Sequence, residues 1–265
     1  MNAPLDVALV RQRVEELSVI PSLVSSITYV EQTRSTNDDA AALAKAGAPH
    51  GTLVIADHQT QGRGRNGRTW FSEPRSNLLF SVVLRPDAAF EASENIASAT
   101  LAVGLGVSDA VAAFVDESVV RIKWPNDVLV KSKKVSGVLV EAAWSGARCE
   151  YLVLGVGMNV LQQQFASPVD AIATSLVREA CVPVSREGVL LELLVCISRR
   201  FDQYVRSGLR ELMGELAAMD ATIGRIVLVG DMNGIAAGID VSGGLRVAVG
   251  GKTSVVRTGE IVFVN

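Results

Sequence analysis

Hydrophobic and polar residues alternate with two different periods along the 265 residues, which separates expected strands from expected helices. Short apolar or alternating runs bounded by turn residues are typical of strands. Apolar residues spaced three and four positions apart are typical of amphipathic helices. The expected strands are 27–31, 52–58, 77–84, 119–124, 128–130, 135–143 and 150–156, and the expected helices are 4–20, 38–46, 92–115 and 185–219. The pattern predicts an α+β fold with helices packed on a hairpin-rich sheet.

The pattern changes beyond Asp220, where five short strands follow one another. Turns such as 242–244 and 250–251 separate these strands, and short strands with regular turns are typical of small barrels. The expected strands are 223–229, 234–241, 245–249, 252–257 and 260–264. We therefore predict a larger domain over residues 1–220 and a small SH3-like β-barrel over residues 221–265.

The composition is that of an ordinary globular chain, with 49% hydrophobic and 20% charged residues and a net charge of −3. A dedicated nucleic-acid binder is usually basic, so this balance argues against one. Cys149, Cys181 and Cys196 form no C-x-x-C pair, which favours reduced thiols and a cytoplasmic protein. Charges within residues 1–20 argue against a signal peptide, and polar residues interrupt the apolar window 96–115, so we expect no membrane segment.

An arginine-rich stretch, Gly-Arg-Gly-Arg-Asn-Gly-Arg-Thr-Trp at residues 62–70, joins two expected strands. No acid lies within this arginine loop to neutralise its three guanidinium groups. Arginine forks match phosphate and carboxylate oxygens, so the loop is suited to a small, multiply charged anion. A solvated hairpin turn is the simpler alternative. The literal G-x-G-x-x-G match is not a dinucleotide fingerprint, because a strand rather than a helix is expected next.

Three further polar clusters lie at expected strand ends: residues 35–37, residues 123–127 with Lys134, and residues 155–159. Each has a simpler explanation when taken alone. Helix capping accounts for Ser-Thr-Asn at 35–37, and turn formation accounts for Pro-Asn-Asp at 125–127. His50 and His58 are the only histidines, which leaves few candidates for a histidine-rich metal site or a His-dependent triad. We assign no protein ligand for a metal ion.

The four clusters together resemble the motifs of biotin protein ligases in order and spacing, over about residues 33–177. The resembling segments are Gly-Arg-Gly-Arg at 62–65, Lys-Trp-Pro-Asn-Asp at 123–127, Lys-Val-Ser-Gly at 134–137 and Gly-Val-Gly-Met-Asn at 155–159. The resemblance implies a mixed, largely antiparallel sheet with packed helices, similar to class II aminoacyl-tRNA synthetases, and the C-terminal barrel. It also implies an enzyme that uses Mg²⁺ and ATP to convert biotin to biotinyl-5′-AMP.

The same resemblance implies that biotin is then transferred to a lysine of the biotin carboxyl carrier domain of acetyl-CoA carboxylase or a related carboxylase. About 26 residues precede the first expected strand of this region, so we expect a monofunctional ligase without a DNA-binding domain and with no DNA partner. Lipoate–protein ligase, which shares the chemistry, is the nearest alternative. A non-catalytic nucleic-acid binder is the alternative from another class, and its affinity would fall steeply with salt.

Site residues follow from the resemblance, position by position. The expected biotin-binding residues are Ser35, Thr36, Asn37, Gln59, Gly62, Arg63, Gly64, Arg65, Lys134 and Gly137. The expected ATP-binding residues are Arg65, Arg68, Trp70, Asn126, Lys134 and Asn159. The expected catalytic residues are Arg63, Arg65, Lys134 and Asp127, the last either acting on the acceptor amine or bracing the turn.

The chemistry of the reaction agrees with these residue types. Joining a carboxylate to the α-phosphate of ATP brings two anions together, so fixed cations are needed to stabilise the developing charge. Mg²⁺ would accompany the triphosphate, held mainly by phosphate oxygens. The glycines of the arginine loop suggest that residues 61–74 are mobile in the empty protein and become ordered over the adenylate, which would keep water away.

Overall fold

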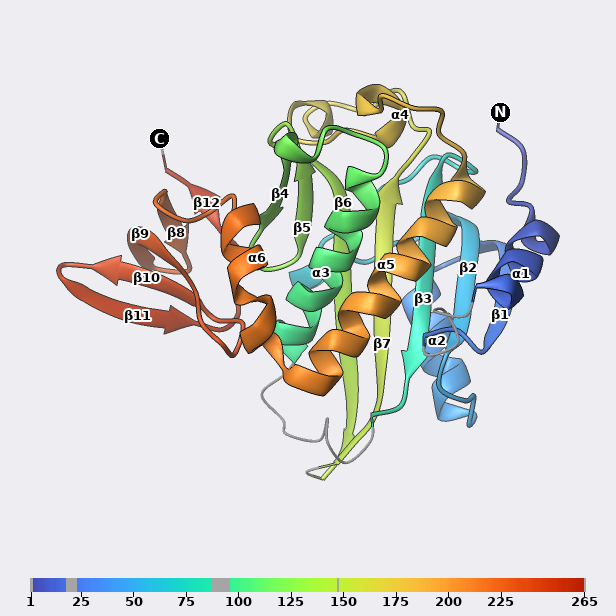
Figure 1. The fold of residues 1–265 in the computed structure, drawn as a ribbon, viewed down its shortest axis with the longest axis horizontal. Helices are drawn as coiled ribbons and strands as arrows, with labels where there is room; N and C mark the ends of the chain where they lie inside the picture. The colour runs from blue at the N-terminus through green and yellow to red at the C-terminus, as the bar shows by residue number, and fades with distance from the viewer. Residues whose placement is uncertain (1, 18–22, 87–95, 147, 265) are drawn as a thin grey trace.

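A computed structural model shows two β-sheets with helices packed against the larger one, and it describes residues 2–17, 23–86, 96–146 and 148–264 (Figure 1). The larger sheet has seven strands in the order β1-β2-β3-β7-β6-β5-β4. They are β1 (Ser26–Thr33), β2 (Thr52–Gln59), β3 (Asn77–Leu84), β4 (Val120–Lys123), β5 (Asp127–Val130), β6 (Lys133–Ser145) and β7 (Arg148–Asn159). Only β1 and β2 pair in parallel, and the other neighbours are antiparallel, so the mixed, largely antiparallel sheet is confirmed.

Helices cover both faces of this sheet. Helices α3 (Ile96–Ala112) and α5 (Arg186–Ser207) lie on one face, and α2 (Thr36–Lys45) lies on the other (Figure 1). Neighbouring residues of a strand point to opposite faces. In β2, Leu53 therefore joins the large core, whereas Val54 packs in the smaller cluster with Ala40 of α2. The face that carries α2 is the one on which the functional site lies.

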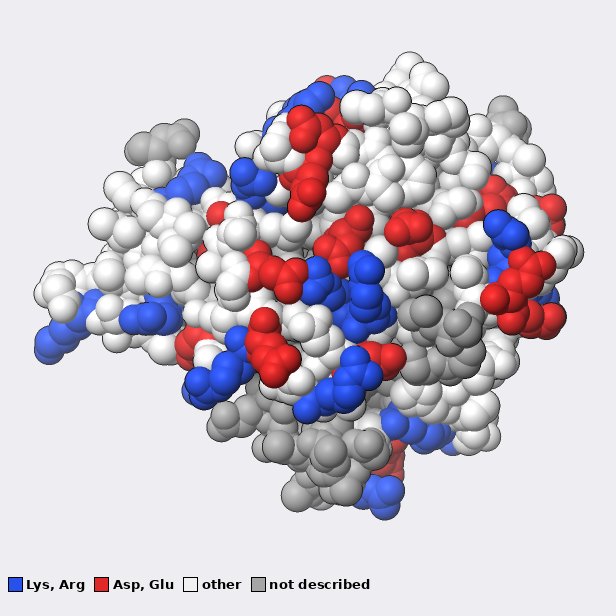
Figure 2. All heavy atoms as spheres, in the orientation of Figure 1, with Lys and Arg blue, Asp and Glu red and all other residues white. Residues whose placement is uncertain are grey.

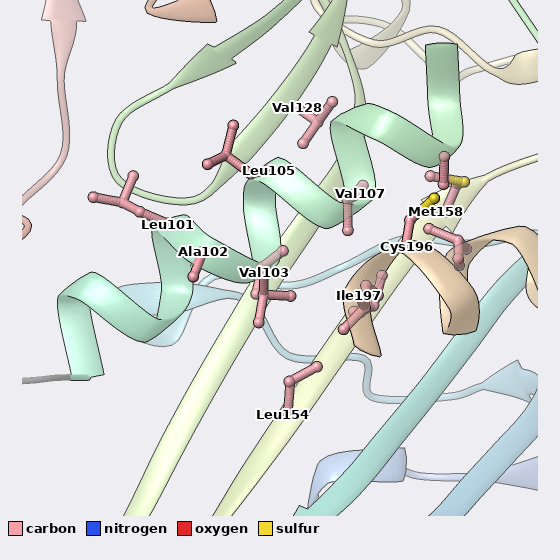
Figure 3. Close-up of a cluster of buried hydrophobic side chains, with 14 of the residues drawn as sticks. Leu101, Ala102, Val103, Leu105, Val107, Val128, Leu154, Met158, Cys196 and Ile197 are labelled. Carbon is pink, nitrogen blue, oxygen red and sulfur yellow. The ribbon is translucent and has the colours of Figure 1, made fainter. Parts of the chain in front are cut away.

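The larger core lies between α3, α5 and the sheet. Leu101, Val103 and Val107 of α3 gather there with Leu154 of β7 and Ile197 of α5 (Figure 3). Each of these side chains is at most 1% exposed. The apolar window 96–115 is therefore a buried helix, and no helix among the described residues is long and apolar enough to cross a membrane. Residues 92–95 of the expected helix lie outside the described residues.

Helix ends differ from the expectation in two places. Helix α1 (Val7–Glu16) is shorter than the expected 4–20, of which residues 18–20 lie outside the described part. The expected helix 185–219 is α5 followed by α6 (Met213–Met219), because Gly208 has a positive φ of 69° and interrupts the helix. The Ser185 hydroxyl caps α5 as expected, accepting from the Gly188 N–H at 3.1 Å. A short helix, α4 (Leu176–Glu179), lies between β7 and α5.

The smaller sheet has the five expected C-terminal strands, all antiparallel, in the order β11-β10-β9-β8-β12. They are β8 (Ile226–Val229), β9 (Met232–Ile239), β10 (Leu245–Val249), β11 (Lys252–Val256) and β12 (Val262–Phe263). Trp124, in the turn between β4 and β5, is 1% exposed and donates to the Gly243 carbonyl at 2.9 Å. The smaller sheet is thus attached beside the β4 edge of the larger one.

Positive and negative side chains are interspersed on the face that carries α3 and α5 (Figure 2). Arg200 of α5, for example, pairs with Asp109 of α3 at 2.7 Å and also with Glu215 of α6. A surface that recognises nucleic acid by charge is normally a continuous basic stripe. The face drawn in Figure 2 has no such stripe among its described residues.

Candidate active site

A cavity of about 410 Å³ lies on the α2 face of the larger sheet. Gly155 and Gly157 of β7 form part of its floor, and they share a face with Val153, which packs against α2. The arginine loop borders the cavity, and Glu260 of the C-terminal region lines it too. Of the expected site residues, the cavity brings together Ser35, Thr36, Asn37, Gln59, Arg63, Gly64, Arg65, Arg68, Trp70, Asn126, Asp127, Lys134 and Gly137.

One part of the cavity, the amide–hydroxyl half, is built by residues 35–37 with Gln59 and Ser81. The Gln59 side-chain oxygen accepts from the Thr36 N–H at 2.7 Å and from the Thr36 hydroxyl at 2.9 Å. Gln59 therefore caps α2, and Ser35, although it is at the N-cap position, makes no side-chain capping bond. Ser81 Oγ lies 2.8 Å from Thr36 Oγ1 and 2.6 Å from Asn37 Oδ1. These groups are held in fixed positions, because hydrogen bonds within the cluster orient them.

Two glycines in β7 allow other groups to approach the sheet closely. A Cβ atom at Gly155 would overlap the Asn37 side-chain amide, and one at Gly157 would lie 2.7 Å from Cε2 of Trp70. Real Cβ atoms do not approach other atoms so closely, so any larger residue would displace Asn37 or Trp70. The glycines of the 155–159 motif are thus explained by packing around the cavity.

The other part of the cavity, the cationic half, contains Lys123, Lys134 and Arg65. Lys134 Nζ lies 2.6 Å from Asp127 Oδ1 and 5.3 Å from the centre of the Trp70 ring. Burial lowers the pKa of both Lys123 and Arg65, and the Asp127 carboxylate partly offsets this effect. Among the described residues, neither Lys123 nor Arg65 has an ion-pair partner within 4.0 Å. Positive charge without a paired carboxylate is what an anionic ligand would neutralise.

No acid lies within the arginine loop, but acids from other parts of the chain pair with two of its three arginines. Arg63 donates to both Glu141 oxygens, at 3.0 and 2.6 Å, and lies 3.0 Å from Asp38. Arg68 pairs with Glu260. The acids come from α2, β6 and the C-terminal region, so they are distant in sequence and only folding brings them near the loop. Among the described residues, the Arg65 side chain makes one long hydrogen bond, 3.5 Å, to Thr258.

Two expected site residues do not line the cavity. Asn159 is 4% exposed, and its side-chain amide donates to the Thr174 carbonyl at 2.9 Å, so it braces the chain beyond β7. Gly62 borders an open groove that adjoins the cavity at the arginine loop, and a Cβ there would lie 2.6 Å from the Trp70 carbonyl oxygen. Both positions support the loops around the cavity in this structure.

Several residues of the site had no role in the sequence-based prediction. Lys123 was part of a recognised motif without an assigned role, whereas Ser81 and Glu141 lie inside apolar strands. A polar residue at the inward position of such a strand is the only signal that could have indicated them. Glu260 and Phe263 line the cavity from the C-terminal region. No local pattern predicts that contact, because it depends on how the two sheets dock.

A metal ion ligated mainly by protein does not fit this cavity. Its two carboxylates, Asp127 and Glu260, each pair with a cation, Lys134 and Arg68 respectively. Within the described ranges, no group of three or more His, Cys, Asp or Glu side chains could hold a metal ion. A divalent cation bound through phosphate oxygens is compatible with this arrangement.

Comparisons with known proteins agree with this fold and site. The sequence model of the Biotin/lipoate A/B protein ligase family matches residues 29–159. The biotin–[acetyl-CoA-carboxylase] ligase of Mycobacterium tuberculosis is 39% identical over 245 residues, which are 89% of this chain and 88% of that protein. The chain belongs to the biotin/lipoate A/B protein ligase family.

Within that family, the chain is similar to biotin ligases. A solved biotin protein ligase from Aquifex aeolicus, in complex with biotin and ATP, has a TM-score of 0.76 and 30% identity, covering 90% of this chain and 98% of that one. The bifunctional ligase/repressor BirA of Bacillus subtilis is 37% identical over 69% of this chain. The chain spans 55% of the length of that relative.

Proposed function

We propose that the protein is a biotin–protein ligase that forms biotinyl-5′-AMP and pyrophosphate from biotin and ATP. It then transfers the biotinyl group to a lysine of a biotin carboxyl carrier domain, that of acetyl-CoA carboxylase or a related enzyme. One observation carries the proposal: a single cavity combines a fixed amide–hydroxyl half with a cationic half. The likeness to biotin ligases over most of the chain supports it.

The amide–hydroxyl half fits the neutral end of biotin. The ureido ring offers one carbonyl acceptor and two N–H donors, so it needs partners of both kinds. The Ser35 hydroxyl, which makes no capping bond, and the oriented side chains of Asn37 and Gln59 supply them. Fixed partners give specificity, because an analogue without the ureido groups would leave buried polar atoms unpaired. This assignment disfavours lipoate, whose ring lacks these groups.

The cationic half fits the step in which a carboxylate oxygen attacks the α-phosphorus and pyrophosphate leaves. Lys134, Arg65 and Lys123 would neutralise the two anions and the developing transition-state charge. Removing one such preorganised donor typically costs about 3–4 kcal/mol. Holding the carboxylate and phosphorus in line contributes roughly 7–11 kcal/mol more. Mg²⁺, entering with ATP, would neutralise further phosphate charge, held by phosphate oxygens rather than by a protein site.

Transfer requires a neutral acceptor amine, and we propose that Asp127 helps to produce it. Its carboxylate lines the cavity beside Lys134. A turn-bracing aspartate would accept backbone N–H groups of its own turn, and Asp127 accepts none within the described residues. The amine nitrogen attacks the acyl carbon, the bond to the phosphate oxygen breaks, and AMP leaves while the amine gives up a proton.

The finer architecture belongs to the same proposal. We infer a relation of the larger sheet to class II aminoacyl-tRNA synthetases and of residues 221–265 to SH3-like barrels. The five short antiparallel strands support the second relation, and the change of sheet beyond Asp220 supports division into domains 1–220 and 221–265. The three free cysteines support the cytoplasmic location that we propose.

Intact-mass measurement of a carrier domain tests the function. The purified protein is incubated with a biotin carboxyl carrier domain, Mg-ATP and either biotin or lipoate. We expect the carrier to gain one biotinyl group with biotin and nothing with lipoate. A carrier whose target lysine is replaced by arginine is the matched control. No mass gain with biotin, or an equal gain with lipoate, would reject the proposal.

A further inference from the structure

Glu141 joins three segments that are distant in sequence, and none of the assigned roles includes it. Its carboxylate accepts two hydrogen bonds from Arg63 of the arginine loop, at 3.0 and 2.6 Å. It also accepts one from the side-chain amide of Asn37 in α2, at 2.7 Å. Both oxygens are thus used by groups that lie 78 and 104 residues away.

The position of Glu141 places it at the margin of the site. It lies opposite Val153 in the pairing of β6 with β7, and Leu139, two residues earlier, lies opposite Gly155 of the cavity floor. Residues two apart on a strand share a face, so the Glu141 side chain stands on the cavity side of the sheet. It lines the open groove behind the arginine loop and is 38% exposed.

The arginine loop is held at two places. Its tip contacts the C-terminal region through Arg68 with Glu260 and through the long Arg65–Thr258 bond. Its first arginine is held by the two-pronged Arg63–Glu141 pair, with Asp38 as a second carboxylate. A two-pronged arginine–carboxylate pair fixes direction as well as distance. Without Glu141, the beginning of the loop would lose its two-pronged contact and keep only the ion pair of Arg63 with Asp38.

A chain of hydrogen bonds connects this contact to the amide–hydroxyl half. Glu141 binds Asn37, Ser81 Oγ lies within hydrogen-bond distance of both Asn37 and Thr36, and Thr36 binds Gln59. A ligand that bonds to Asn37 or Thr36 therefore acts on groups that also hold the loop. We propose that Glu141 is a positioning residue that holds the arginine loop closed through Arg63 and couples this closure to the ligand through Asn37.

This inference rests on the proposed function, and two readouts keep the two apart. The first is the escape of preformed biotinyl-5′-AMP, followed after a chase with unlabelled biotin. Glu141→Ala should release the adenylate about tenfold faster, because hydrogen bonds to a charged partner are lost. The KM for biotin should rise by a similar factor, while kcat for adenylate formation changes less than about threefold. The unfolding midpoint should fall modestly, because the exposed ion pair adds little stability but the buried Asn37 amide loses its acceptor.

The second readout is amide exchange of residues 62–70, which needs no turnover. Exchange in Glu141→Ala should be faster than in the unaltered protein, both with biotin and without it. Glu141→Gln, which keeps an acceptor for Asn37, should lie between the two. In Arg63→Ala combined with Glu141→Ala, the increase in exchange should be smaller than the sum of the two single increases, because both changes break the Arg63–Glu141 contact. Glu150→Ala, an exposed carboxylate of β7 outside the cavity, is the matched control.

The outcomes are distinct. An unaltered protein that forms no adenylate would reject the proposed function, and the exchange measurement would still test the role of Glu141. Unchanged loop exchange in Glu141→Ala would overturn that role. So would additive losses in the double variant, or a loss that appears only in kcat.

Discussion

The two halves of the cavity differ in how their polar groups are satisfied. In the amide–hydroxyl half, Thr36, Asn37 and Gln59 bond to one another or to neighbours at 2.6–2.9 Å. In the cationic half, Lys134 has one carboxylate partner, and Lys123 and Arg65 have none within the described residues. The first half is suited to a neutral ligand of fixed shape, and the second keeps positive charge available for anions.

Only the cationic half carries a free-energy cost in the empty protein. A satisfied hydrogen-bond network is rigid and adds to stability. Partly buried cations without a paired carboxylate lose hydration, which is why burial lowers the pKa of Lys123 and Arg65. Binding of an anion would offset that loss. The comparison therefore predicts large losses of activity when the cations are removed and smaller losses when the hydroxyl and amide groups are removed. It also predicts that neutralising an unpaired cation lowers activity but raises the free energy of unfolding.

The largest effect is expected from Lys134→Ala. Removing a cation that the transition state needs should lower the rate of adenylate formation by about 10²–10³. Biotin-dependent pyrophosphate release measures this rate. Lys131→Ala is the control, since Lys131 lies three residues away, pairs with Glu179 and does not line the cavity. A Lys134→Ala protein that turns over like the control would remove its assigned role.

A smaller effect should separate Arg65 from Arg68. Arg65→Ala should lower kcat/KM for ATP by about 10–100-fold, as expected for hydrogen bonds to a charged ligand. Arg68→Ala should have a weaker effect, because Arg68 already pairs with Glu260 and its side chain is 65% exposed. Steady-state kinetics with varied ATP compare the two. Equal losses of kcat/KM would show that the pair with Glu260 does not keep Arg68 from contributing to ATP binding.

Thr36→Val tests the amide–hydroxyl half with a side chain of nearly the same shape. Gln59 would keep its bond from the Thr36 N–H but lose the one from the hydroxyl. We expect biotin to bind up to about tenfold more weakly, since a lost hydrogen bond costs about 0.5–1.5 kcal/mol, and the KM for ATP to stay unchanged. Calorimetry measures the affinity for biotin, and steady-state kinetics measure the KM for ATP. A rise in the KM for ATP together with weaker biotin binding would show that the two halves do not act separately.

The smallest effect concerns the pH dependence of Lys123. Because burial lowers its pKa from 10.5, Lys123 loses its proton at a lower pH than in the unfolded chain. ATP affinity should therefore fall as the pH rises through the lowered pKa. Stability should rise over the same interval, because the unfolded chain then binds more protons. Lys123→Met should abolish this part of both profiles, and profiles identical to those of the unaltered protein would contradict the assignment.

Local patterns predicted the strands well, because burial alternates along them, as in β2 where Leu53 and Val54 face opposite cores. Helix ends were less predictable, since apolar spacing continues past the last helical residue in both α1 and α3. Most residues of the clusters did come together in one cavity, because the ends of β1, β2 and β7 lie beside the starts of β3 and β6 at the same edge of the sheet.

The contacts between distant segments were not predictable from the sequence. The Arg63–Glu141 pair depends on β6 lying two strands away from β3, beyond β7. The Arg68–Glu260 pair depends on docking of the smaller sheet near Trp124. Asn159 belongs to a recognised motif and was expected in the site. Its side-chain amide instead donates to the Thr174 carbonyl, and Asn159 does not line the cavity.

Isotope tracing tests most directly whether the cavity joins a carboxylate to the α-phosphate. Biotin labelled with ¹⁸O in its carboxylate is incubated with the protein, Mg-ATP and a carrier domain, and the nucleotide product is analysed by mass spectrometry. Attack of the carboxylate on the α-phosphorus predicts AMP that carries one labelled oxygen. Unlabelled AMP, or ADP with label in inorganic phosphate, would contradict the account.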